Sequence, residues 1–325
     1  MTNIQTQRKL VEILRIVNES DEAVGARTIA SHLSRRGYPI GERAVRYYLT
    51  LLDYKGFTAK LGYSGRIITE KGLTELNEAI VGDRVGFVIT KIEEFIYRTT
   101  LDTAQHTGDI ITNVTTINKD DFETVVEIAG RVIDGGYSVS PYVRIVEEGD
   151  KAGSIIIPYG SVGIITMCSM TIDGILIKHG IPTDIMYGGV LKIEDKVPSA
   201  YTDMISYKGT SLDPIQIFTS RRMTAIMDAV DKGAGAVLSN LRTVPSIAYE
   251  RAREVLHDAR KIGITGWIEN FGRDDSLGIN LEDDVVGINI YAGVNPMAAL
   301  SELAIEANVK SISSLMDVRL LKERL

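Results

Sequence analysis

The chain has 325 residues, 44% of them hydrophobic and 24% charged, which is typical of a globular protein with room for two domains. No apolar run approaches the roughly 20 residues of a membrane-spanning helix. The one cysteine, Cys168, excludes an intrachain disulfide and favours the cytoplasm, and the four histidines lie too far apart for a metal-binding motif.

The formal net charge of −7 is unevenly distributed along the sequence. Residues 1–71 contain 12 Lys and Arg against 7 Asp and Glu, whereas the remaining residues contain 24 against 36. A small basic head on a large acidic body indicates a module for polyanions, attached to a part that does not bind them.

Residues 1–80 carry the pattern of a winged helix-turn-helix domain. The predicted elements are three helices, two short strands and a last helix, at residues 5–18, 25–37, 41–56, 57–61, 66–69 and about 70–80. In this fold the third helix enters the major groove of DNA and the wing, formed by the two strands, lies against the backbone.

The third predicted helix has one apolar face and one polar face. We expect its polar face, the wing and the start of the second helix to contact bases and phosphates. The candidate DNA-binding residues are Arg43, Arg46, Tyr47 and Thr50 on the helix, Lys60, Tyr63 and Arg66 on the wing, and Arg27 and Thr28. The alternative is a winged helix that contacts a protein.

Residues 81–325 are predicted to form an α/β regulatory domain built from two similar halves, at about 85–205 and 212–325. Three segments recur in the same order: VGFVITK and DPIQIFT, ITNVTTIN and LSNLRTVP, VGIITMCSMTIDGIL and VGINIYAGVNPMAAL. This similarity superposes Asn113 on Asn240, and indicates a tandem duplication.

Two such halves are expected to pack about a pseudo-twofold axis, with a ligand in the crevice between them. Each half has a strand followed by a helix start, where Asn295 is expected to cap the second-half helix. Helix N-termini favour anions, so a small dicarboxylate is the hypothesis. The candidate effector-binding residues are Thr166, Cys168, Ser169, Asn240, Gly293, Asn295 and the one cation, Arg242, which has no charged equivalent in the first half.

Five segments together resemble the NrpR family of nitrogen regulatory repressors, found in methanogenic archaea and their relatives. They are RRGYPIGERAVRYYL, KLGYSGRIITEKG, MCSMTIDGILIKHGIP, SNLRTVPSIA and GVNPMAAL. The resemblance implies a homodimeric repressor of nitrogen-assimilation genes that binds an inverted-repeat operator and is released by 2-oxoglutarate. It implies no cofactor, and a related co-repressor protein as a further partner in some members.

Two other functions stay open at this point. One is a co-repressor whose winged helix contacts a partner protein. The other is a bifunctional enzyme with a DNA-binding appendage, but GAGAVL lacks the third glycine of a dinucleotide fingerprint and no P-loop, HExxH or GxSxG motif occurs. We therefore expect no enzymatic activity.

Overall fold

The structure is a computed structural model that describes residues 4–325 apart from 21, 36–39, 63, 74, 75, 77–87, 154 and 269–276. The chain divides into two compact units, residues 1–85 and 86–325, which we describe separately. The predicted domain junction near residue 80 lies outside the described residues. Within the described part, no helix is long and apolar enough to cross a bilayer.

The first unit is a winged helix, as the sequence predicts. Its elements are α1 (Ile4–Asn18), α2 (Ala26–Arg35), α3 (Glu42–Tyr54), β1 (Thr58–Leu61) and β2 (Gly65–Ile68), followed by helical residues 70–73. The three helices enclose a buried core that includes Ile13, Ile29 and Leu49. The antiparallel strands β1 and β2 form the wing, and β2 also bridges to Val24.

The second unit mixes helices and antiparallel strands. Its helices are α5 (Val88–Arg98), α6 (Phe122–Asp134), α7 (Met170–Lys178), α8 (Pro214–Ser220), α9 (Ile226–Lys232), α10 (Tyr249–Lys261) and α11 (Asn295–Ala298). Short 3-10 turns are η1 (Lys119–Asp121), η2 (Ser246–Ala248), η3 (Ala299–Leu303) and η4 (Val318–Leu320). Its strands are β3 (Asp109–Asn118), β4 (Tyr142–Val146), β5 (Lys151–Ala152), β6 (Ile155–Ile156), β7 (Ser161–Met167), β8 (Asp184–Glu194), β9 (Val197–Ser206), β10 (Gly235–Pro245), β11 (Val285–Tyr291), β12 (Ala307–Asp317) and β13 (Glu323–Arg324).

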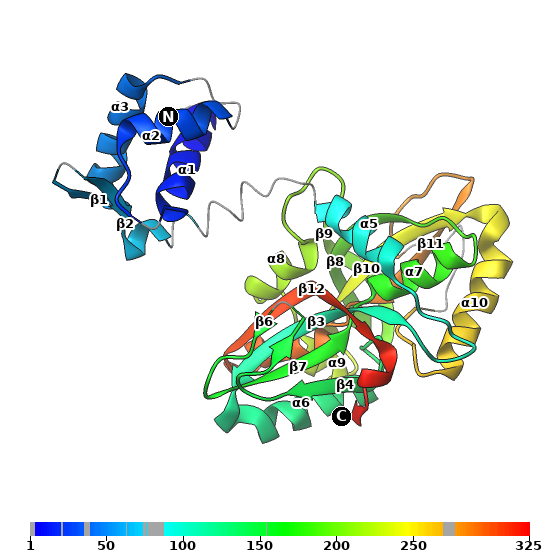
Figure 1. Ribbon diagram of the computed structural model, residues 1–325. Coiled ribbons are helices and arrows are strands. Elements are labelled where there is room, and N and C mark those ends of the chain that lie inside the picture. The colour runs from blue at the N-terminus through cyan, green and yellow to red at the C-terminus, as the bar shows by residue number, and fades with distance from the viewer. Residues whose placement is uncertain are drawn as a thin grey trace. The chain divides into compact units, whose positions relative to one another are not determined.

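The order of elements repeats along this unit. The sequence β3, α6, β7, α7, β8 returns as β10, α10, β11, α11, β12. The strands form two main sheets, with orders β12-β3-β7-β4-β13 and β11-β10-β8-β9 (Figure 1). The first sheet therefore contains β3, β7 and β4 of the first half together with β12 and β13 of the second. The other sheet contains β10 and β11 of the second half together with β8 and β9 of the first.

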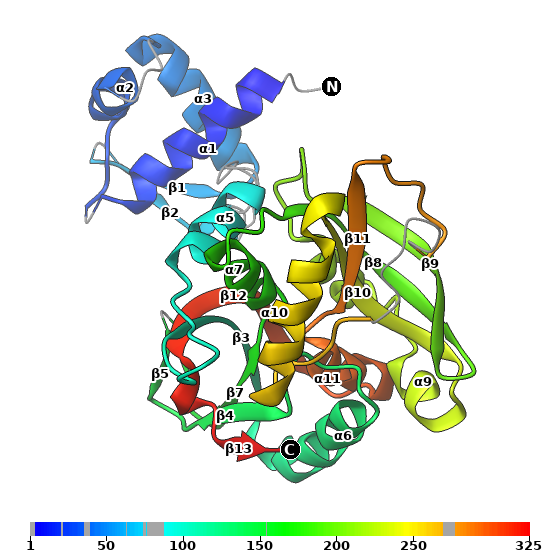
Figure 2. The ribbon, with the colours of Figure 1, turned by 90° about the vertical axis from the view of Figure 1, so that its right-hand side faces the viewer.

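This exchange of β8 and β12 changes the expected picture of two separate lobes. After α7, the chain crosses to the second sheet, where β8 buries Val190, Leu191 and Ile193 in a core shared with residues of β10 and α11. The second large core likewise mixes the halves, and Figure 2 shows α10 of the second half beside α7 of the first. The halves are interleaved because β8 is buried in the other half's sheet, and Ala307 and Val309 of β12 pack, partly buried, against the shared core.

A buried ion pair also joins the halves. Arg242 on β10 donates a hydrogen bond from Nη1 to Asp173 Oδ2 on α7 over 2.8 Å, and neither side chain is exposed. Burial raises the pKa of Asp173, and the neighbouring guanidinium opposes that shift. Arg242 Nε and Nη2 and Asp173 Oδ1 have no hydrogen-bond partner. The pair therefore has unused hydrogen-bonding capacity inside the core.

We predict that Arg242→Met lowers the free energy of unfolding by about 3–5 kcal/mol, because it leaves Asp173 buried without its cation. Replacing both partners, with Arg242→Met and Asp173→Leu together, should restore most of this stability. Urea denaturation of each variant measures the effect. As a control, Arg253→Met in the exposed Arg253–Glu250 pair of α10 should cost less than about 1 kcal/mol. Equal losses in the single and double core variants would contradict the prediction.

Candidate effector site and nucleic-acid interface

The two faces of α3 differ as the sequence predicts. One face is buried in the core of the winged helix through Val45, Leu49 and Leu52. The opposite face is exposed and carries the four predicted contacts, Arg43, Arg46, Tyr47 and Thr50. Tyr47 keeps 64% of its surface exposed, so the face offers an aromatic side chain beside two arginines.

Arg46 is available to a ligand although it has a partner. Its guanidinium hydrogen-bonds to Glu42, one helical turn earlier, and its side chain remains 70% exposed. An exposed pair at this spacing stabilises a helix by only a few tenths of a kcal/mol. A phosphate or a guanine edge can therefore replace the carboxylate at little cost.

Arg66 is placed differently from the other predicted DNA contacts. Its Nε lies 2.9 Å from Asp53 Oδ2 at the end of α3, and its side chain is only 16% exposed. Thr58 donates to the same carboxylate over 2.6 Å. Asp53 therefore fastens both wing strands to α3, and Arg66 orients the wing.

The remaining predicted DNA contacts lie at the surface where the structure describes them. Lys60 is exposed on β1, and Arg27 and Thr28 are exposed in the first turn of α2. Tyr63, at the tip of the wing, lies outside the described residues. The described candidates include cations on α2, on α3 and on the wing.

In the second unit, the two strand-to-helix junctions meet at one small cavity. Its volume is about 10 Å³, which is room for about one water molecule. Four predicted effector residues line it, namely Cys168, Ser169, Asn240 and Gly293. The other lining residues are Asn113, Met170, Tyr207, Asp213, Ile215, Ala292, Val294, Ser311 and Ile312.

Pairs of equivalent residues surround this cavity. Asn113 on β3 corresponds to Asn240 on β10, and Cys168 corresponds to Ala292 at the ends of β7 and β11. All four line the cavity, so it lies where the two halves meet. The two asparagines have different partners, since Asn113 Nδ2 donates to Thr166 Oγ1 over 3.2 Å. Thr166 thus lies directly behind the cavity wall.

A chain of buried hydrogen bonds runs past the cavity. The Ser311 hydroxyl donates to Asp213, whose Oδ1 lies 3.3 Å from the Tyr207 hydroxyl. Tyr207 donates to Asn240 Oδ1 over 2.6 Å, and Asn240 Nδ2 donates to Ser169 Oγ over 3.0 Å. The carbonyl of Ser169 accepts from Arg242 Nη1 over 3.3 Å. Polar groups therefore connect β12 to the buried ion pair.

Burial sets the protonation of the groups around this cavity. It raises the pKa of the Cys168 thiol to about 12, so the sulfur stays protonated and is a poor nucleophile. It also raises the pKa of Asp213, although hydrogen bonds from Ser311 and the Ile215 amide oppose the shift. The cavity is therefore suited to hydrogen bonding rather than to covalent chemistry.

Two predicted effector residues have structural roles instead. The prediction that Asn295 caps α11 is wrong: Asn295 is the first residue of the helix and donates from Nδ2 to the carbonyls of Leu238 and Tyr137. Its Oδ1 accepts from the Leu238 amide, so the side chain is bound to β10 and cannot cap. At Gly293, a methyl group would overlap the Met167 carbonyl oxygen. Asn295 thus fixes the start of α11 to β10, and Gly293 allows the chain to pass close to the end of β7.

Sequence reasoning aligned Asn113 with Asn240 but did not name it as an effector contact, and it missed four further polar members of this site, Asp173, Tyr207, Asp213 and Ser311. Asp173 was detectable as the one charge in the apolar segment MTIDGILI. Asp213 precedes a proline and accepts from Ile215 N over 3.1 Å, so it caps α8. That helix-start signal gives no hint that its carboxyl group also faces a cavity. Tyr207 and Ser311 carry no sequence signal that we recognise.

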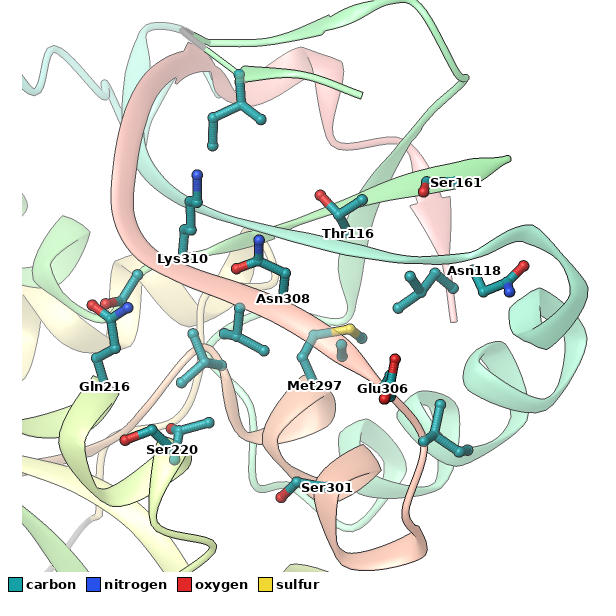
Figure 3. Close-up of a pocket in the computed structure, with 18 of the residues that line it drawn as sticks. Thr116, Asn118, Ser161, Gln216, Ser220, Met297, Ser301, Glu306, Asn308 and Lys310 are labelled. Carbon is teal, nitrogen blue, oxygen red and sulfur yellow. The ribbon is translucent and has the colours of Figure 1, made fainter. Parts of the chain in front are cut away.

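A much larger groove lies next to the small cavity. Its volume is about 1150 Å³, and Figure 3 shows part of its lining. Ile215, Val294 and Ser311 line both spaces. Its walls come from α8, from the segment after β6, and from β12. Arg222 and Lys310 are its two cationic lining residues, and Glu306 is its acidic one.

Comparison with known proteins matches both units. Residues 85–323 match the model of the NrpR regulatory domains NRD1 and 2, and residues 11–76 match a ribonuclease R winged-helix domain. The regulatory unit also resembles a crystal structure of a nitrogen repressor-like protein from Methanococcus jannaschii. That match has a TM-score of 0.63 at 26% identity and covers 74% of this chain and 100% of the other.

Curated relatives are named as regulators. The global nitrogen regulator NrpRI of Methanosarcina mazei is 46% identical over 99% of this chain and 100% of its own length. The global nitrogen regulator NrpR of Methanococcus maripaludis is 33% identical over 97% of this chain, and that of Methanocaldococcus jannaschii is 36% identical over 91%. The matches span 55% and 51% of these two longer proteins. With its winged helix and its regulatory unit both accounted for, the chain belongs to the NrpR family of nitrogen regulators.

Proposed function

We propose that the protein is a transcriptional repressor of nitrogen-assimilation genes. It binds an inverted-repeat operator as a dimer, through α3 and the wing, and 2-oxoglutarate releases it. The family membership supports nitrogen regulation, and the exposed polar face of α3 is the observation that supports DNA as the partner.

The exposed cations of the winged helix suit a polyanion such as DNA better than an apolar protein surface. Exposed cations lie on three elements, at Arg27, Arg43 and Lys60. Contacts of this kind position a recognition helix by binding phosphates, and arginines on the helix can pair with guanine. The ion pair between Arg66 and Asp53 keeps the wing at a fixed angle to α3.

The small cavity between the halves supports a small polar effector. Asn240 and Ser169 offer hydrogen bonds at its wall, and Arg242 lies behind Ser169 with two guanidinium nitrogens, Nε and Nη2, that lack a partner. A dicarboxylate is much larger than one water molecule, so its binding requires the wall formed by α8 and Ser311 to move outward. Such a movement would couple effector binding to the arrangement of the halves, and through the dimer to the spacing of the winged helices.

We predict that Arg46→Ala weakens operator binding by about 1–3 kcal/mol, because it removes a major-groove contact. Effector binding should be unchanged. Electrophoretic mobility shift at several salt concentrations measures the loss. Arg98→Ala is the matched control, since Arg98 on α5 is also exposed and pairs with a glutamate four residues earlier. Undiminished binding by the Arg46 variant would refute the proposed recognition helix. A wild-type DNA affinity that does not fall as the salt concentration rises would favour a protein partner.

We predict that 2-oxoglutarate binds the purified protein, whereas glutamate, glutamine and citrate bind weakly or not at all. Asn240→Leu should abolish this binding, since it removes two hydrogen-bonding atoms from the cavity wall. Gln216→Ala is the control, because Gln216 lines only the large groove. Isothermal titration calorimetry measures the affinity of each protein variant for each of these ligands. Loss of binding in the Gln216 variant alone would place the effector in the groove instead.

A further inference from the structure

The large groove follows the edge of a strand. Seven consecutive residues line it, from Ile305 to Ser311, and five of them belong to β12. Because successive side chains of a strand point to opposite faces, a space lined by all of them includes the strand's edge, and Thr116 and Ser161 show that it also extends over β3 and β7. Figure 3 shows Glu306, Asn308 and Lys310 in sequence along this edge.

The edge of β12 has no partner among the described residues. Its one neighbour in the sheet is β3, on the other side. In the second sheet, the equivalent strand β8 pairs with β10 on one side and with β9 on the other. The duplication therefore shows that this strand position accepts an antiparallel neighbour, and after β12 the chain turns away to form η4 and β13 instead.

We infer that the free edge of β12 is a dimer interface, where it pairs antiparallel with β12 of a second copy of this chain. The inference deepens the proposed function, on whose dimeric repressor it rests. Unpaired strand edges are sites of β-addition, and a twofold axis brings the same edge of each copy together.

The sequence of this edge is complementary to itself. If the twofold axis passes at Asn308, antiparallel pairing places Glu306 of one copy opposite Lys310 of the other, and the reverse pair forms beyond the axis. Both side chains are exposed, and neither has an ion-pair partner among the described residues. Two opposite-charge pairs thus form across the axis, and cross-strand pairs of this kind favour one register.

Apolar side chains beside the edge point to burial by a protein. Ile156 and Tyr159 line the same groove, and they remain 60% and 90% exposed. Large exposed apolar side chains next to an open strand edge are typical of an interaction surface. A second copy that adds its strand to β12 would cover part of this surface as well.

Charge reversal tests this arrangement without altering the core. Glu306→Lys or Lys310→Glu puts like charges opposite each other twice in a homodimer, so each variant should have a dimer dissociation constant raised roughly tenfold or more. An equimolar mixture of the two variants should recover dimers, because the mixed pair faces opposite charges again. The double variant, with both changes in one chain, should also recover them. Analytical ultracentrifugation over a concentration series measures each case.

Lys192→Glu is the matched control. Lys192 lies on β8, whose outer edge is already paired with β9, so this variant should dimerise like the wild-type chain. Circular dichroism should show the same unfolding transition for all variants. Wild-type dimerisation by both single variants, failure of the mixture to recover dimers, or a monomeric wild-type chain would overturn the inference. Sedimentation requires no DNA, so loss of operator binding alone would count against the repressor and not against this interface.

Discussion

The exchange of strands between the two halves is the constraint on which the regulatory unit depends. Each half supplies neighbouring strands to one sheet and sends two further strands, β8 and β9 or β12 and β13, to the other. The apolar side chains of β8 are therefore buried, and Ala307 and Val309 of β12 partly buried, only when both halves are present. The strand-to-helix junctions are thereby brought to one point, where Asn113 and Asn240 line the same cavity. The polar groups at this point are therefore held in place by residues of both halves.

Local sequence patterns predict much of this architecture. The helical spacing of Val45, Leu49 and Leu52 gives α3 its buried face, and the glycines around the wing mark its turn. The repeated segments align β3 with β10 and β7 with β11. The exchange of strands is not predictable in this way, because similarity between two segments does not say which sheet a strand joins. That choice depends on pairing between residues far apart in the chain.

In the candidate site, too, the sequence indicates some of the residues, whereas their contacts depend on the tertiary structure. The duplication draws attention to Cys168 and Asn240, and to Arg242 as a charge found in one half only. What Arg242 contacts is decided by tertiary structure: its partner Asp173 lies on a helix of the other half, behind Ser169. Asn295 follows the strand end where a cap is expected, yet its amide is taken up by the backbone of β10 because that strand passes directly beside it. Arg66 is similar, since the acid that holds it is 13 residues earlier in the sequence.

Interleaved halves also affect how the protein is made. One edge of β3 is paired only by β12, about 200 residues later in the chain. The ribosome therefore has to synthesise nearly the whole chain before these two strands can pair. Until then, the apolar side of β3 has to be shielded by transient contacts or by a chaperone. A gene fragment that encodes the first half alone should therefore yield an aggregating polypeptide, and any ancestral single-copy protein would have needed two chains that exchanged strands.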